Sequence, residues 1–379
     1  MNEVYFSALG GGQRVGGSCY YLKLGSSNII LDAGVGMRED VVSDPEFFSL
    51  LTSPFVRSLS QIDQIFISHA HMDHVGYLPE LMKDAERSAV YMTDMTASLA
   101  CYQLFDRQET GGGSAGKEGF FRRITPVSYM QTMKFREYTV SFLPAGHIPG
   151  AMMTLFEYKN RRILYTGDYS FGRTPLTDGC VIPEKTEIDI LILCALHARH
   201  PGYRKKDGQI CREAERVRRQ VLRFRRPVSC RVNQLSKGIE FLQMLNRLNE
   251  SRPEKIDIYL DAFMRPLIEK IERQYISLMT PYTRFCRDCD CPYGPNIFLY
   301  SGKKKNISFR EEIQIEFSLH EDFAEMKHFI RKINPKQAVI VHCAPSDSPS
   351  GLTIEQEILM DAECRTQFLF AEEGELYVL

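Results

Sequence analysis

Three histidines and one aspartate lie within six consecutive positions, His69, His71, Asp73 and His74, one serine after the apolar residues 65–67. His69 and His71 are two positions apart, so an extended backbone at the end of a buried strand points them the same way. Asp73 and His74 then fall on the opening turn of a helix. This spacing favours two adjacent metal ions, one held by His69 and His71 and the other by Asp73 and His74. Imidazole and carboxylate ligands suit zinc, with manganese or iron as further candidates. The alternative is a histidine-rich surface turn.

Two further side chains have the same placement, at the end of a strand. His147 lies in a turn framed by glycine and proline, between expected strands at 137–143 and 152–158. Asp168 ends an expected strand that begins at 162, directly after a glycine. His147 is placed where the first ion needs a third ligand. Asp168 could bridge the two ions, because each carboxylate oxygen can take one.

Asp32 closes an expected strand over 28–32, just before an Ala-Gly pair. There it could accept hydrogen bonds from the metal-site loops, or it could be a simple turn aspartate. Upstream, the glycine-rich stretch 10–17 invites a dinucleotide-binding interpretation. That motif needs glycine where this chain has Val15, and no helical pattern follows directly, so a turn between strands fits better.

Composition places the chain among ordinary globular proteins. It has 379 residues, of which 44% are hydrophobic and 25% charged, with a net charge of -1. The length indicates two domains, and the near-zero charge means that any nucleic-acid binding must come from a local patch. There is no run of 18 apolar residues and no basic, then apolar, N-terminal segment, so we expect a cytoplasmic protein without membrane contact.

Eleven cysteines are scattered without paired spacing, which favours reduced thiols. Cys286, Cys289 and Cys291 could begin a further metal site, but they lack an adjacent fourth ligand. A loop of free cysteines is the better interpretation.

A basic segment follows the expected strand at 187–193. Residues 199–226 carry eleven lysines and arginines against three acids, a net charge of +8. Such a segment could follow a phosphate backbone, with Tyr203 and Phe224 available to stack on bases. The alternative is a solvated helix face, for which the acids are too few to form many ion pairs. The candidate contacts are Arg204, Lys205, Lys206, Arg212, Arg216, Arg219 and Arg223.

Two histidines near the C-terminus again end expected strands. His320 follows the apolar alternation that starts at 313, and His342 follows the apolar run from 337. A helix over 323–333 joins them. Either could be an ordinary core histidine, but the repeated placement favours a functional role.

Taken in order, Asp32, the His69–His74 motif, His147 and Asp168 resemble the metallo-β-lactamase superfamily. The resemblance implies an α/β fold, a four-layer αββα sandwich whose strand-end loops hold two metal ions. The Phe317–Asp322 stretch, His342 and the stretch around Asp261 resemble the β-CASP branch, whose members cut RNA or DNA. In that branch a histidine at the position of His342 goes with RNA-processing members.

The resemblance also implies a domain plan. Residues 1–194 and 311–379 would form the metallo-β-lactamase domain, and 195–310 a small inserted α/β cap of β-CASP type that contains the basic segment. Two departures stand out. Cys194 occupies the place of an acid that supports the histidine equivalent to His320, and the cap is shorter than usual.

These observations predict a two-zinc phosphodiester hydrolase, a ribonuclease of β-CASP type. His69, His71 and His147 would hold one ion, Asp73, His74 and His342 the other, and Asp168 would bridge them. Asp32 and Cys194 would lie behind the ligands, and His320 would donate a proton to the leaving oxygen. Two alternatives remain open: a catalytically weakened RNA-binding subunit that pairs with a related chain, and a hydrolase of a small substrate. RNA is the expected partner, and a homodimer is also open.

Overall fold

Two seven-stranded sheets form the larger part of the fold in a computed structural model. It describes residues 3–38, 41–106, 114–182, 187–205, 208–232, 234–286, 293–301, 311–344, 353–359 and 366–379. One unit comprises 1–172, 178–204 and 320–379, and a second comprises 173–177 and 205–319. The predicted domain plan with boundaries at 194/195 and 310/311 stays a prediction. The units themselves change over at 204/205 and 319/320.

The first sheet has the strand order β21-β1-β2-β3-β6-β7-β8. Its β21-β1-β2-β3 part is antiparallel, whereas β3, β6, β7 and β8 run parallel to one another. The bounds are β1 (Val4–Gly10), β2 (Cys19–Leu24), β3 (Ser27–Leu31), β6 (Gln64–Phe66), β7 (Ala89–Thr93), β8 (Ile124–Val127) and β21 (Leu376–Val378). A separate two-stranded ribbon pairs β4 (Gly36–Arg38) with β5 (Val41–Ser43).

The second sheet has the order β20-β19-β13-β12-β11-β10-β9. Strands β9 to β12 are antiparallel neighbours, and β12, β13, β19 and β20 are parallel. The bounds are β9 (Thr132–Lys134), β10 (Tyr138–Pro144), β11 (Met152–Tyr158), β12 (Arg161–Tyr165), β13 (Ile190–Cys194), β19 (Gln337–Val341) and β20 (Gln367–Phe370).

The two sheets pack face to face through aromatic and aliphatic side chains. Phe66 of the first sheet meets Phe156 of the second edge to face, with ring centroids 5.4 Å apart. Tyr20 and Tyr165 make a similar contact at 5.8 Å. Because buried apolar area is the main favourable term in folding, this shared core holds the sandwich together.

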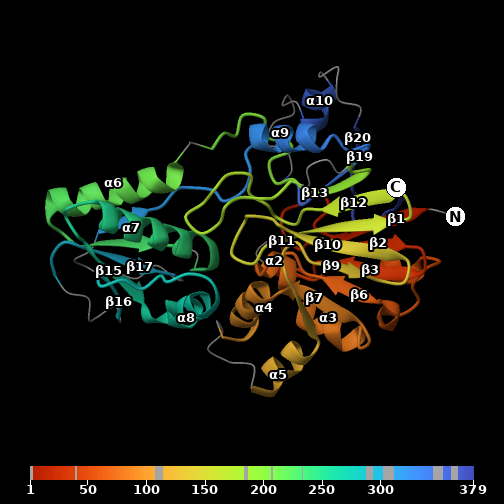
Figure 1. The fold of residues 1–379 in the computed structure, drawn as a ribbon, viewed down its shortest axis with the longest axis horizontal. Helices are drawn as coiled ribbons and strands as arrows, with labels where there is room; N and C mark the ends of the chain where they lie inside the picture. Colours follow the sequence, from red (N-terminus) through yellow and green to blue (C-terminus); the bar gives the residue numbers. More distant parts are fainter. Residues whose placement is uncertain are drawn as a thin grey trace. The chain divides into compact units, whose positions relative to one another are not determined.

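Helices cover the outer faces of the sandwich, which gives the predicted αββα layers (Figure 1). On the side of the first sheet lie α3 (Leu78–Asp84) and α4 (Asp94–Cys101), and on that of the second lies α9 (Phe323–Ile333). The capping box of Asp322 and Glu325 fixes where α9 begins. The other α-helices among the described residues of this unit are α1 (Phe48–Thr52), α2 (Met72–Val75), α5 (Ser114–Arg122) and α10 (Ile354–Leu359).

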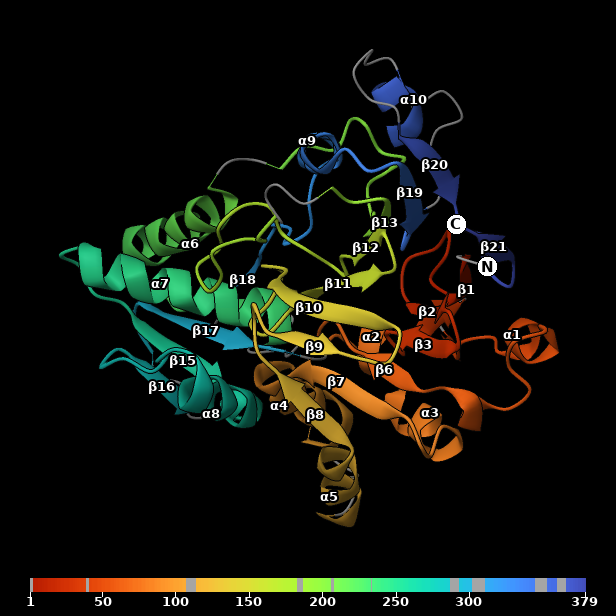
Figure 2. The same ribbon diagram turned by 45° about the vertical axis from the view of Figure 1, so that its right-hand side comes forward.

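The second unit is an α/β domain around a five-stranded, all-parallel sheet of order β16-β15-β17-β14-β18. Its strands are β14 (Val228–Arg231), β15 (Asp257–Asp261), β16 (Thr283–Cys286), β17 (Asn296–Tyr300) and β18 (Glu311–Gln314). Its helices are α6 (Gln209–Phe224), α7 (Ile239–Ser251) and α8 (Arg265–Gln274). Helices α6 and α7 lie side by side in both views (Figures 1 and 2).

Two expectations need correction. The strand predicted to end at His320 ends at Gln314, because only 311–314 pair with β14, and Phe317 packs on Phe241 of α7 instead. Cys286 is disulfide-bonded, so the expectation of reduced thiols fails there, although seven other described cysteines are not in disulfides. Cys289 and Cys291 lie outside the described residues, so the three-cysteine metal site is untested. Among the described residues, no helix is long and apolar enough to cross a membrane.

Candidate metal centre

Three histidine nitrogens and a carboxylate form the first cluster. His69 Nε2 lies 3.0 Å from His71 Nδ1, which lies 3.3 Å from His147 Nε2. Asp168 Oδ2 is 3.9 Å from His69 Nε2 and 3.8 Å from His147 Nε2. Ligands about 2.0–2.1 Å from a tetrahedral zinc are about 3.3 Å from one another, so the donor atoms have the spacing of a zinc site.

Asp73, His74 and His342 form the second cluster. His342 Nε2 lies 4.0 Å from Asp73 Oδ2. His74 Nε2 lies 3.4 Å from Asp168 Oδ1, whereas Oδ2 of the same carboxylate faces the first cluster. Asp168 therefore presents one oxygen to each group of ligands, which is the arrangement expected for a bridge.

The ends of five segments bring these side chains together. His69 and His71 lie in the loop after β6, and α2 carries Asp73 and His74. The other three lie in the turn between β10 and β11, in the loop after β12 and directly after β19: His147, Asp168 and His342. All seven predicted ligands are thus in one place, drawn from both sheets of the sandwich; that they bind metal remains a prediction.

Asp32 lies behind the second cluster, in contact with His74. Its side chain is fully buried, and its Oδ2 lies 2.7 Å from His74 Nδ1. It also accepts hydrogen bonds from the backbone and hydroxyl of Ser68 and from the hydroxyl of Tyr165. This contact leaves His74 Nε2 as the atom that faces Asp168, as expected of a residue that orients a ligand.

Burial determines the charge of the first cluster. It holds the pKa of His69 and of His147 well below the usual histidine range, and that of His71 at about 4. These rings are therefore neutral near pH 7, with nitrogen lone pairs available to a cation. Burial also opposes charge on Asp168, but the attraction of His342 and His74 outweighs it and holds the pKa of Asp168 well below its usual value. Neutral imidazoles around an ionised carboxylate suit a divalent ion.

His320 also reaches this site, although it does not end a strand. Its Nδ1 lies 3.7 Å from Asp168 Oδ2, and its ring centroid lies 4.8 Å from that of His147. Burial lowers the pKa of His320, with Asp168 acting against it. The side chain keeps 28% of its surface exposed, so it lies where the site opens to solvent.

Cys194 is buried at the end of β13, with its Sγ 3.8 Å from the hydroxyl of Tyr165. Burial raises the pKa of the Cys194 thiol well above its usual value, so the side chain is neutral at physiological pH. Hydrogen bonds connect it to the ligands through Tyr165 and Asp32. Cys194 therefore cannot supply the negative charge of the acid that the family resemblance implies at this position.

The predicted nucleic-acid contacts are divided between the two units. Arg204 belongs to the first unit and donates to the carbonyls of Pro201 and Tyr203. Tyr203 stacks on His197 with ring centroids 3.8 Å apart, and Phe224 is 51% exposed. Lys205 belongs to the second unit, and Lys206 lies outside the described residues.

Helix α6 presents the remaining predicted contacts as one stripe. Arg212, Arg216, Arg219 and Arg223 fall within about 60° of each other around a helix with 3.6 residues per turn. Ile210, Ala214, Val217 and Val221 are buried on the opposite side. Arg216 is partly engaged by Glu213 and by the carbonyl of Gln314, and the other three arginines are exposed.

Some contacts of this centre were not predicted. Ser18, Ser68 and Tyr165 touch His342, His69 and Asp32, respectively. A serine or tyrosine at the edge of a strand has no distinctive spacing, so only the folded chain identifies these three.

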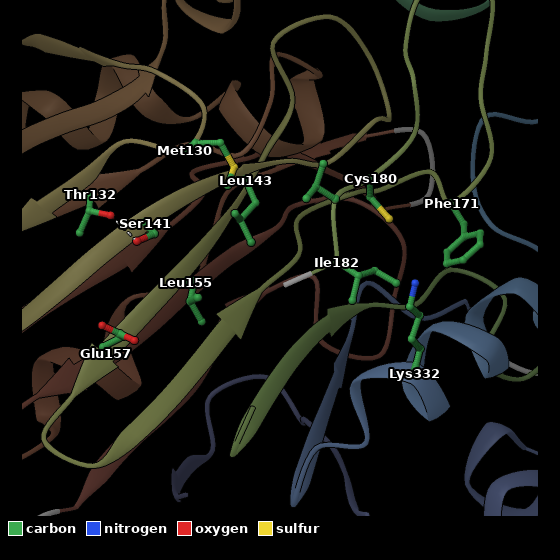
Figure 3. A pocket seen from close by; sticks show the side chains of 11 residues that line it. Met130, Thr132, Ser141, Leu143, Leu155, Glu157, Phe171, Cys180, Ile182 and Lys332 are labelled. Atoms are coloured by element: carbon green, nitrogen blue, oxygen red, sulfur yellow. Dashed lines mark hydrogen bonds between the residues drawn. The ribbon is translucent and has the colours of Figure 1, made fainter. Parts of the chain in front are cut away.

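A cavity of about 740 Å³ lies elsewhere, on the outer face of the second sheet (Figure 3). Ser141, Leu143 and Leu155 line it, whereas their neighbours in sequence, Phe142 and Phe156, point into the core between the sheets. None of the seven predicted ligands lines this cavity. It is thus separate from the metal centre.

A two-sheet αββα sandwich with paired histidine and aspartate clusters at its strand ends defines a class of metal-dependent hydrolases. The profile of the Metallo-beta-lactamase superfamily matches residues 12–219, and the chain belongs to this superfamily. A protein of unknown function from Enterococcus faecalis V583 has the same fold over the whole of both chains, with a TM-score of 0.66 and 15% identity.

Several curated relatives are named as ribonucleases. The chain is 30% identical over 205 residues to the endoribonuclease ysh-1 of Neurospora crassa, and the matched region covers 50% of this chain and 23% of that protein. It is 29% identical over 266 residues to the probable RNase MJ4 of Methanocaldococcus jannaschii, covering 67% and 58%, respectively. The chain thus spans less than two thirds of the length of either. These relatives support the resemblance to the β-CASP branch.

Proposed function

We propose that this protein is a two-zinc phosphodiester hydrolase that cuts RNA. The observation that carries the proposal is the placement of Asp168, with Oδ2 toward the three histidines of the first cluster and Oδ1 toward His74 of the second. A single carboxylate between two sets of lone-pair donors is what a pair of ions about 3.5–4 Å apart requires.

The residues fit zinc better than magnesium. Five of the seven donors are imidazoles, a ligand that zinc prefers, whereas magnesium favours oxygen. His69, His71 and His147 would hold one ion, Asp73, His74 and His342 the other, and Asp168 would bridge. When bound, two zinc ions would acidify water and stabilise the negative charge that builds on the phosphate.

The protein itself would supply the proton for the leaving oxygen. His320 is the candidate, because its ring lies beside His147 and Asp168 and keeps part of its surface open to solvent. A group with a pKa near or below neutrality transfers its proton readily to an alkoxide. Asp168, close to Nδ1, would hold the ring in orientation.

RNA is the proposed substrate for two reasons. The two relatives described above are named as ribonucleases, and α6 carries an exposed arginine stripe. From Arg212 to Arg223 this stripe extends about 16 Å at 1.5 Å per residue, enough for two or three phosphates of a single strand. Guanidinium groups bind phosphate oxygens in pairs, so this surface would hold the backbone without reading the bases.

A second candidate is an RNA-binding subunit with weakened catalysis that pairs with a related chain. The observation in its favour is Cys194, a neutral thiol at the position where the family resemblance implies an acid. Under this alternative the metal centre would form, but the proton transfer by His320 would be slow.

Metal analysis combined with cleavage of 5′-labelled RNA tests the proposal. We expect two zinc ions per chain and salt-sensitive cleavage. Asp168→Asn should lose at least one ion and lower turnover by about 10²-fold or more. Asp94→Asn, an exposed aspartate on α4, is the matched control and should behave like the unsubstituted chain.

Three results would redirect the proposal. Two bound ions with RNA binding but no cleavage would favour the non-catalytic subunit. Cleavage of bis-p-nitrophenyl phosphate without cleavage of RNA would favour a small-substrate hydrolase. An unsubstituted chain that binds fewer than two ions would refute the paired centre.

A further inference from the structure

Ser18 lies at the centre of the second ligand cluster without being one of its predicted ligands. Its side chain is fully buried just before β2, with Oγ 3.0 Å from His342 Nδ1 and 3.4 Å from His74 Nε2. Its backbone N–H donates to the carbonyl of Asp73 over 2.8 Å. One serine thus contacts all three members of the cluster.

The backbone of His342 is held in a conformation that needs support. Its φ is +50°, in the left-handed region that costs a non-glycine residue about 1 kcal/mol or more. The backbone N–H of His342 donates to the carbonyl of Gly11 over 2.7 Å, and the same carbonyl accepts from the hydroxyl of Tyr20. The bond from His342 fixes the strained residue in register with the loop that precedes Ser18.

The glycine-rich loop makes this contact possible. Gly11 has a φ of +64°, and a Cβ at this position would lie 2.9 Å from the Cα of Ser18. Only glycine lets the loop approach Ser18 so closely while its carbonyl faces His342. The glycines of residues 10–17 therefore place Ser18 and His342 against each other, which gives a physical reason for this loop beyond a turn between strands.

We infer that Ser18 is a positioning residue for the second metal site, holding the ring of His342 so that Nε2 faces Asp73. The inference rests on the proposed function. In the inferred arrangement, Nδ1–H of His342 donates a hydrogen bond to the Ser18 hydroxyl, which leaves the ring lone pair on Nε2, 4.0 Å from Asp73 Oδ2. Without the hydroxyl, either nitrogen could carry the proton and the ring could turn. The first cluster has no contact with this hydroxyl among the hydrogen bonds of the described residues.

Zinc binding by Ser18→Ala tests the inference in the full-length chain. Equilibrium dialysis across a range of free zinc, followed by elemental analysis, measures the two ions separately if their affinities differ. We expect one ion to bind as in the unsubstituted chain and the other about 10–100-fold more weakly. Ser88→Ala is the control, because Ser88 is also buried but donates to the carbonyl of Ile62, which is not a predicted ligand.

Two additional measurements separate positioning from general stability. Thermal unfolding of the zinc-free chains should show no greater loss for Ser18→Ala than for Ser88→Ala. In a His342→Ala background, Ser18→Ala should have no further effect on zinc binding, because the ring that it positions is gone.

Each outcome decides the matter. Weakening of one ion that disappears in the His342→Ala background supports the inference. Unchanged binding of both ions, or equal weakening of both, overturns it and leaves the proposed function intact. If the unsubstituted chain binds fewer than two ions, the proposed function itself fails.

Discussion

Replacing Asp32 with asparagine should weaken zinc binding while keeping the fold. Asparagine has nearly the same shape and tolerates the left-handed backbone of Asp32, whose φ is +58°. The weaker zinc binding would come from lost electrostatic contacts. Oδ2 of Asp32 accepts hydrogen bonds from the hydroxyls of Ser68 and Tyr165 and lies 2.7 Å from His74 Nδ1. If the NH₂ group of the asparagine pointed toward these three groups, hydrogen-bond donors would face one another.

The magnitude follows from these contacts. In the unsubstituted chain, the backbone N–H of Ser68 donates to Asp32 Oδ1 over 2.6 Å. If the asparagine turns its oxygen toward the three donors, its NH₂ group faces that backbone N–H instead. Either orientation leaves at least one buried donor unpaired, at a cost of about 1–3 kcal/mol. His74 also loses its anionic partner, and such losses weaken metal binding by about 10–100-fold, or about 1.4–2.7 kcal/mol.

Zinc affinity measured by competition with a coloured chelator is the assay, with denaturant unfolding of the zinc-free chain beside it. Asp63→Asn is the control, since Asp63 also accepts a hydrogen bond from a backbone N–H, that of Asn28 over 2.7 Å, but bonds to no predicted ligand among the hydrogen bonds of the described residues. Zinc affinity equal to that of the unsubstituted chain in Asp32→Asn would refute the reasoning, because the contact with His74 would then have no effect on the site.

Three further predictions concern proton transfer, RNA and pH. His320→Ala should leave zinc content unchanged and lower RNA turnover by about 10²–10⁴-fold, measured under saturating substrate. Replacing all three of Arg212, Arg219 and Arg223 by glutamine should make the plot of log affinity against log salt concentration less steep by about 2. Each phosphate contact to single-stranded RNA contributes about 0.7 to that slope, and three contacts would be lost. Burial raises the pKa of Glu240 to about 7, so the folded state favours the protonated form. Its contribution to stability is therefore complete below about pH 4.3 and is lost as the pH rises toward 7. The free energy of unfolding should fall over this range, and Glu240→Gln should make the fall smaller. Denaturant titrations of the zinc-free chain at several pH values measure it.

Each of these has a result that contradicts it. Unchanged turnover in His320→Ala would remove its assigned role. For the arginine stripe, substitution of three exposed charges of the first unit, Lys83, Arg87 and Arg122, is the control, and an equal change of slope in both sets would mean that α6 has no special part. A pH dependence that is the same with and without Glu240 would show that this carboxyl does not titrate in that range.

The sequence was sufficient to predict which side chains come together at the candidate metal centre, because they follow strands that are recognisable by their apolar character. His342 comes directly after β19, whose Ala338–Val341 are all buried, and the loop after β6 carries His69 and His71 as expected. The strand expected before His320 illustrates the limit. Alternation of Ile313, Ile315 and Phe317 is typical of a strand, but apolar side chains can also be buried without a paired backbone.

The basic segment shows why a count of charges does not identify an interface. Arg218 contributes to the net charge of 199–226, yet it is buried and donates to Asn249 and to the carbonyl of Glu254. Arg199 lies over the ring of Phe370 and donates to Gln13. Such arginines would have to give up existing partners to reach a phosphate, so they add little to binding. The three exposed arginines of α6 are less engaged, because Arg223 lies over the exposed ring of Phe224 and Arg212 and Arg219 are open to solvent. The test of RNA binding therefore depends on them and not on the total charge of the segment.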